Sequence, residues 1–234
     1  MVKKIYYKIS YLYRIITSLK YLQFSYSQEG EDLILNRLLP DKKDGFFVDI
    51  GAHHPKRFSN TYLFYLKGWN GINIDPNIGI MKVFNKIRPR DINIEIGVSK
   101  NEDNILYYQF NEPALNTFDK NEAEIKSKNN SEVYRITNII KVKTLPLSII
   151  LDKYLKKNIV IDFMTIDVEG YDLDVLQSNN WSLYRPKILL VEELRTNIDN
   201  IYKQSDINSF LKLQNYILYH RTYNTSFYKD NLIK

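Results

Sequence analysis

From residue 45 onward the chain alternates short apolar runs with segments of helical periodicity, and this alternation is the feature that most constrains its fold. We expect strands at residues 46–50, 71–75, 92–96, 161–167 and 187–192. Helix-like segments lie between them, near residues 59–67, 79–87, 145–156 and 172–179. Runs rich in Ile, Val and Phe, each followed by a helix, are typical of parallel strands with both faces covered. The sequence therefore predicts an α/β fold with a mostly parallel sheet.

Other parts of the chain depart from this alternation. Residues 205–213 have helical periodicity, and residues 216–222 and 225–229 then resemble two strands. We expect these two strands to close the sheet as an antiparallel pair. Residues 105–110 could form an extra strand in the middle of the chain. Residues 119–134 are polar with little apolar periodicity, so we interpret them as a mobile loop or a solvated helix.

The positive charge of the chain is concentrated at its N-terminus. Of the formal net charge of +6, the first 24 residues contribute +5 through four lysines and one arginine, with no acidic residue. Residues 25–234 are therefore nearly neutral, and we expect them to form a single domain behind a basic arm, residues 1–24. Because nucleic-acid enzymes usually carry a basic surface on the fold itself, we expect no nucleic-acid partner.

The N-terminal arm has the periodicity of an amphipathic helix. Ile5, Ile9, Leu12, Ile16 and Leu19 recur at steps of three and four residues. The apolar runs of the arm are too short for a secretory signal or a bilayer-spanning helix. Basic and aromatic residues beside an apolar stripe suit a helix that lies on a membrane surface, and the alternative is packing against the domain or a second copy. Since the chain has no cysteine, we expect a cytoplasmic protein, with or without peripheral contact at the inner membrane face.

The first expected strand ends in a turn that can approach a ligand closely. In FFVDIGAHHP, residues 46–55, Gly51 directly follows the strand. Glycine lets the backbone come near a ligand where a Cβ atom would clash, although it is equally common in ordinary tight turns. Ser59 is a good N-cap for the helix that follows. Because open parallel sheets bind ligands at the carboxyl ends of their strands, we expect the binding site at this turn.

The second expected strand ends in a carboxylate, Asp75. In several nucleotide-cofactor folds an acid at this position accepts hydrogen bonds from the hydroxyls of a ribose. The turn after the first strand lacks the glycine pattern that binds a pyrophosphate. A cofactor with a ribose and no phosphate fits this combination, and S-adenosylmethionine is such a cofactor.

Five longer segments carry a resemblance to a known family. They are SYSQEGEDLIL (25–35), FVDIGAHHPKRFSNTYLFYLKGWNGINIDPN (47–77), RPRDINIEIGVS (88–99), FNEPALNTF (110–118) and IDFMTIDVEGYDLDVL (161–176). Together they resemble the FkbM family of S-adenosylmethionine-dependent methyltransferases over most of residues 25–230. The resemblance implies a Rossmann-like class I methyltransferase fold with a seven-stranded sheet. It also implies O-methylation, with a hydroxyl of a saccharide or glycan precursor as the expected acceptor.

The resemblance further implies a set of cofactor contacts at the ends of the strands. Asp49, Gly51 and Ala52 match the first cofactor motif, and Asp75 matches the acid that binds the ribose. The complete expected set is Asp49, Gly51, Ala52, His53, Asn60, Asp75, Ile96, Gly97, Val98 and Asp167. For the acceptor we expect contacts from Asn116, Glu169 and Glu192.

Two histidines, His53 and His54, stand where many methyltransferases have further glycines. An alcohol acceptor must lose its proton, and neutral imidazole is a suitable base near pH 7. We hypothesise that one of the two histidines removes this proton, with Asp167 as its orienting group or as an alternative base. The alternative is that both histidines only cap the turn or pack against the cofactor.

The same residues also allow other functions. Asp167, Glu169 and the Glu192-Glu193 pair, together with the histidine pair, could bind Mg²⁺, but acids at strand ends are common without a metal and we do not favour this site. The acceptor could also be another small polar metabolite. The missing pyrophosphate glycines disfavour a nucleotide-cofactor oxidoreductase, and acids at several strand ends disfavour a non-catalytic binding module.

Overall fold

The computed structural model describes residues 2–40, 42–129, 133–194 and 198–232. Within them a seven-stranded sheet has the strand order β3-β2-β1-β7-β8-β10-β9. In that order the strands are β3 (Ile92–Glu95), β2 (Asn70–Asp75), β1 (Phe46–Ile50), β7 (Phe163–Ile166), β8 (Ile188–Glu192), β10 (Thr225–Asp230) and β9 (Tyr216–Arg221). The first five are parallel, whereas β10 is antiparallel to both β8 and β9. The predicted fold class, a Rossmann-like α/β fold with an antiparallel C-terminal pair, is confirmed.

The order of the strands fixes where a ligand can bind. From β1 the chain proceeds outward to β2 and β3, and it later returns to place β7 on the other side of β1. The direction of the connections therefore changes between β1 and β7. At such a switch point the flanking loops separate, which leaves a crevice at the carboxyl ends of the two strands.

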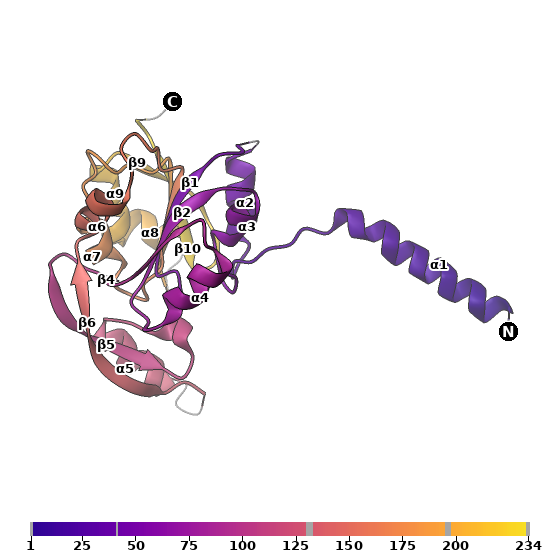
Figure 1. Cartoon of the computed structure of the whole chain (residues 1–234), viewed down its shortest axis with the longest axis horizontal. Helices are drawn as coiled ribbons and strands as arrows, with labels where there is room; N and C mark the ends of the chain where they lie inside the picture. The colour runs from indigo at the N-terminus through magenta and orange to yellow at the C-terminus, as the bar shows by residue number, and fades with distance from the viewer. Residues whose placement is uncertain (1, 41, 130–132, 195–197, 233–234) are drawn as a thin grey trace.

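Helices cover both faces of the sheet, with α6, α7 and α9 on one side and α2, α3 and α4 on the other (Figure 1). The helices of the domain core are α2 (Glu31–Leu38), α3 (Tyr62–Leu66), α4 (Ile80–Ile87), α6 (Leu147–Tyr154), α7 (Asp172–Gln177), α8 (Ile198–Gln204) and α9 (Asp206–Leu213). Alternation along β1 supplies both faces, because Val48 packs with Ile150 of α6 while Phe47 packs with Phe64 of α3. Helix α8 was not predicted.

A second sheet lies beside the carboxyl ends of the large one, and the sequence predicted only part of it. Its strands are β4 (Gly97–Val98), β6 (Ile136–Leu145) and β5 (Asp103–Phe110), in the order β4-β6-β5. Strand β5 contains the expected strand at 105–110. Strand β6 was missed because most of its apolar residues are only half-buried or exposed, so it lacks the strong apolar run of a central strand.

The polar segment after β5 contains two short helices, η2 (Pro113–Leu115) and α5 (Lys120–Asn129). Residues 119–134 were predicted to form either a mobile loop or a solvated helix. For residues 120–129 the helix is confirmed and the loop is wrong. This helix is attached to the body through Ala123, which is fully buried against Tyr108 and Phe110 of β5. A single small buried residue gives too little apolar periodicity to be recognised in the sequence.

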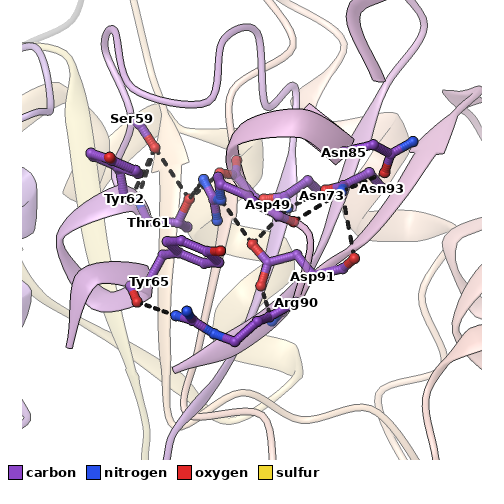
Figure 2. A network of polar contacts seen from close by, with 12 residues as sticks. Asp49, Ser59, Thr61, Tyr62, Tyr65, Asn73, Asn85, Arg90, Asp91 and Asn93 are labelled. Atoms are coloured by element: carbon purple, nitrogen blue, oxygen red, sulfur yellow. Dashed lines mark hydrogen bonds and ion pairs between the residues drawn. The ribbon is translucent and has the colours of Figure 1, made fainter. Parts of the chain in front are cut away.

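A buried polar network joins β1 and β2 to the helices beneath the crevice (Figure 2). The Thr61 hydroxyl donates to Oδ2 of Asp49 at 2.6 Å and accepts from Nη1 of the fully buried Arg88 at 3.0 Å. Arg88 Nε also donates to Oδ2 of Asp91 at 2.8 Å, and Asp91 accepts from the Asn73 amide at 3.1 Å. Because a buried charge needs a partner, this network fixes the start of α3 against the strands.

The N-terminal arm forms the helix that its periodicity predicted, α1 (Val2–Ser18), followed by a short turn, η1 (Leu19–Tyr21). Figure 1 shows α1 projecting away from the domain on an extended segment. Large apolar side chains on it, such as Tyr11, Leu12 and Ile16, are exposed. Among the described residues, no helix combines the length and apolar composition needed to cross a bilayer. The surface that α1 contacts, membrane or protein, stays a prediction.

Candidate active site

A pocket occupies the switch point of the sheet, at the carboxyl ends of β1, β2 and β7. The small sheet and η2 close its other side through Tyr107, Pro113, Ala114 and Phe118. Of the residues expected to contact a ligand, the pocket brings together Gly51, His53, Asp75, Ile96, Val98, Asn116, Asp167 and Glu169. These residues come from five separate segments of the chain, so their convergence follows from the fold.

Gly51 is positioned by the backbone of both neighbouring strands. Its N–H donates to the carbonyl oxygen of Ile74 at 3.0 Å, and its φ of +80° lies in the left-handed region. A Cβ atom built on it would lie 1.7 Å from the carbonyl oxygen of Asp167. Only glycine fits here, because the ends of β1 and β7 approach each other through this residue.

Replacing Gly51 with alanine is expected to destabilise the domain by about 3 kcal/mol or more, since left-handed strain and overpacking add. The matched control is Gly79→Ala, because Gly79 also has a positive φ of +83° but no atom lies within 4 Å of its Cβ position. This control is expected to lose only about 1 kcal/mol. Urea unfolding measures both variants, and equal losses would contradict the close approach described for Gly51.

Asp75 ends β2 with its carboxylate toward the pocket and is 5% exposed. Its Oδ2 accepts the backbone N–H of His53 at 2.8 Å, and its Oδ1 accepts that of Asn77 at 2.8 Å. Burial raises the pKa of Asp75 to about 6. Each carboxylate oxygen has a further lone pair, so Asp75 can hold the β1 loop and still accept hydrogen bonds from a ligand.

The two histidines have different surroundings. His53 lines the pocket and takes a left-handed conformation with φ +48°. Burial, followed by the nearby Arg57 charge, lowers the pKa of His53 to about 4, so the imidazole is neutral near pH 7. Arg57 Nη1 lies 3.4 Å from His53 Nε2. Nη1 and Nη2 of Arg57 also donate one hydrogen bond each, both of 2.9 Å, to the carboxylate of Glu112, which precedes η2. The ion pair thus links the β1 loop to the small sheet.

His54 instead stabilises its own turn. Its Nδ1 accepts the backbone N–H groups of Lys56 and Arg57 at 3.1 Å and 3.0 Å. It does not line the pocket formed by the described residues. Its geometry therefore matches the turn-capping alternative, whereas a role of His53 as the base stays a prediction.

An apolar slot forms the part of the pocket beyond Asp75. Ile96 and Val98 line it together with Tyr107 of β5 and Phe118 from the segment that follows η2. Asn116, expected at the acceptor, lines this same slot and is anchored by its Oδ1, which accepts the Phe110 N–H at 2.7 Å. Tyr107 and Phe118 were not predicted, although FNEPALNTF was recognised as a motif that contains Phe118. Apolar and aromatic side chains of this kind suit contact with a purine ring.

Acidic residues line the opposite end of the pocket. One carboxylate oxygen from each of Asp167, Glu169 and Glu192 lies within 4.8 Å of the others. Burial, and then the negative charges of Glu169 and Asp172, raise the pKa of Asp167 well above its usual range. Lys126 of α5 forms an ion pair with Glu169. Glu192 does not itself line the pocket but lies beside it in this cluster, and its contact with an acceptor stays a prediction.

Four residues expected at the cofactor lie outside the lining of the pocket. The Asp49 carboxylate belongs to the network with Thr61, and the Asn60 amide donates to Thr165 Oγ at 3.0 Å. Ala52 packs against α4, and Gly97 lies against Phe118. Their contacts with a cofactor stay predictions.

A parallel sheet with a pocket at its switch point, a glycine after β1 and an acid at the end of β2 is the arrangement typical of Rossmann-like folds that bind nucleoside-type cofactors. The model of the methyltransferase FkbM domain matches residues 49–218, more than two thirds of the chain. The chain therefore belongs to the FkbM family, which confirms the resemblance, and is a methyltransferase. A comparison with curated proteins gives no match.

Proposed function

We propose that this protein transfers a methyl group from S-adenosylmethionine to a hydroxyl of a saccharide or glycan precursor. The observation that carries the proposal is the convergence of Asp75, Gly51 and His53 on one pocket. The family supports methyl transfer, the pocket supports the cofactor, and His53 supports a hydroxyl acceptor. The saccharide follows from the family resemblance alone.

The residues of the pocket fit the cofactor. Asp75 has lone pairs available for the two ribose hydroxyls, and the apolar side chains of Ile96, Val98 and Tyr107 suit contact with the adenine. Gly51 lets β1 and β7 approach closely, so that its backbone lines the pocket where the methionine part would lie. When bound, the cofactor supplies a methyl group activated by a positive sulfur.

The chain itself aligns the acceptor and receives its proton. At pH 7 the neutral imidazole of His53 has one lone pair, which can accept the proton of an acceptor hydroxyl while Arg57 stays paired with Glu112. Because its lowered pKa makes His53 a weak base, the proton moves to it only as the oxygen–methyl bond forms. Arg57 and Glu112 hold the β1 loop against the small sheet, which positions His53 beside the pocket.

The affinity for S-adenosylmethionine is expected to depend on pH through Asp75. The ribose hydroxyls bind the ionised carboxylate best, and burial raises the pKa of Asp75 to about 6. The affinity for S-adenosylmethionine is therefore highest above pH 6, and below pH 6 it falls by up to about tenfold for each pH unit. Calorimetric titrations from pH 5 to pH 8 measure this effect. Asp75→Asn is the control, and a wild-type profile no steeper than its profile would contradict the assignment.

Transfer of a labelled methyl group tests the acceptor. The purified protein is incubated with S-adenosylmethionine labelled in the methyl group and with panels of oligosaccharides and acidic small metabolites. We expect an ether-linked methyl group on a saccharide oxygen. Label found only on small metabolites would support the competing acceptor class, and label on nitrogen or carbon would contradict O-methylation.

A further inference from the structure

The acidic cluster at the end of the pocket has a geometry suited to a cation. Asp167 directly follows β7 and Glu192 ends β8, and these adjacent parallel strands finish at the same edge of the sheet. Glu169 reaches the same point from the turn after β7, where its φ is +56°. One oxygen from each carboxylate lies within 4.8 Å of the other two. Three oxygens this close can bind one small ion together.

Glu192 has an oxygen that lacks a partner. The residue is 9% exposed, and its Oε2 is buried with no hydrogen bond among the described residues. A buried carboxylate oxygen without a donor is costly, so native proteins usually satisfy it with a donor, a water molecule or an ion. The next residue, Glu193, is buried to a similar degree, but its oxygens accept the hydroxyls of Ser205 and Tyr228.

The charge of the cluster also favours a cation. Asp167, Glu169 and Glu192 carry three negative charges when ionised, and the ion pair from Lys126 to Glu169 offsets one of them. Asp172, in the following turn, is buried as well and accepts the backbone N–H groups of Val168 and Gly170. A divalent cation would reduce the repulsion among these carboxylates.

The cluster lies at the boundary between two hollows. Asp167 and Glu169 line the cofactor pocket. Glu192 lines a second cavity, formed with Asp172 after β7 and with Ser205 and Asp206 at the start of α9. An ion bound by the three carboxylates would therefore be reachable from both sides.

We propose that Asp167, Glu169 and Glu192 bind a divalent cation of the Mg²⁺ class between the cofactor pocket and the second cavity. Mg²⁺ prefers carboxylate oxygens, and three protein ligands leave positions for water or for another oxygen. Because Glu192 lines the second cavity, an acceptor that reaches the cofactor pocket from that cavity would place an oxygen on the ion. This assignment of the acceptor rests on the proposed function, whereas the binding of the cation does not.

Titration of the full chain with MnCl₂, followed by the electron paramagnetic resonance signal of free Mn²⁺, tests the site without cofactor or acceptor. We expect one tightly bound Mn²⁺ per chain that excess Mg²⁺ displaces. Glu192→Gln keeps the shape of the side chain but removes its charge, so its Mn²⁺ affinity is expected to fall at least tenfold. Glu193→Gln is the matched control and is expected to bind Mn²⁺ like the wild type.

Two results would overturn the proposal: no Mn²⁺ bound by the wild type, or equal affinity in Glu192→Gln and the wild type. Should Glu192→Gln fail to fold by circular dichroism, Asp167→Asn takes its place with the same expected loss. Calorimetry with S-adenosylmethionine in the presence of a chelator keeps the two proposals apart. If the protein binds S-adenosylmethionine but not Mn²⁺, the cation site is contradicted and the proposed function is not.

Discussion

Replacing Asp75 with alanine is expected to weaken the binding of S-adenosylmethionine by roughly 100-fold. A hydrogen bond to a charged group contributes about 1.5–3 kcal/mol, and the ribose offers two hydroxyls to this carboxylate. The substitution also removes the acceptor of the His53 and Asn77 backbone N–H groups, so the β1 loop loses an anchor. Calorimetric titration measures the loss of affinity directly.

The control for this variant is Glu95→Ala. Glu95 ends β3, pairs in register with Asp75 across the sheet and is exposed. Its carboxylate accepts the Gly79 N–H and does not line the pocket formed by the described residues. Affinity within about twofold of the wild type is expected for it. If both variants bind equally well, Asp75 is not the ribose acid.

Replacing His53 with asparagine is expected to lower kcat by about 10²–10⁴-fold, the usual contribution of a positioned base. Asparagine tolerates the left-handed backbone of this residue, so the loop keeps its conformation while the imidazole is lost. The binding of S-adenosylmethionine is expected to change little. Turnover and calorimetry on the same preparation separate a loss of chemistry from a loss of folding.

His54→Asn is the matched variant, because an asparagine oxygen can still accept the N–H groups of Lys56 and Arg57. Its turnover is expected to stay within a few-fold of the wild type. Near-normal turnover of His53→Asn would contradict the assignment of His53 as the base. A larger loss of turnover in His54→Asn than in His53→Asn would indicate that His54 is the base.

The large sheet could be predicted because its central strands are continuous apolar runs. The segment around Phe163 is covered on both faces, so its residues need no alternation and are recognisable directly. The small sheet could not be predicted in the same way. Strand β6 has polar and exposed residues over much of its length, and β4 has only two residues, Gly97 and Val98.

The site was predicted in part for similar reasons. Residues just after strand ends, such as Gly51 and Asp75, have positions that follow from sheet topology alone. The side chains of the His53-His54 pair could not be told apart, because their difference depends on one left-handed residue and two backbone hydrogen bonds. Lys126 reaches Glu169 from a helix that showed no apolar periodicity, so its contact required the structure.

Calorimetric titration of the purified full chain with S-adenosylmethionine, S-adenosylhomocysteine, NAD⁺ and NADP⁺ tests the central claim most directly. We expect the first two to bind with one site per chain, and the two dinucleotides to produce no heat, because the β1 turn has no glycine pattern for a pyrophosphate. A folded sample, free of co-purified cofactor, that binds neither of the first two would contradict the account.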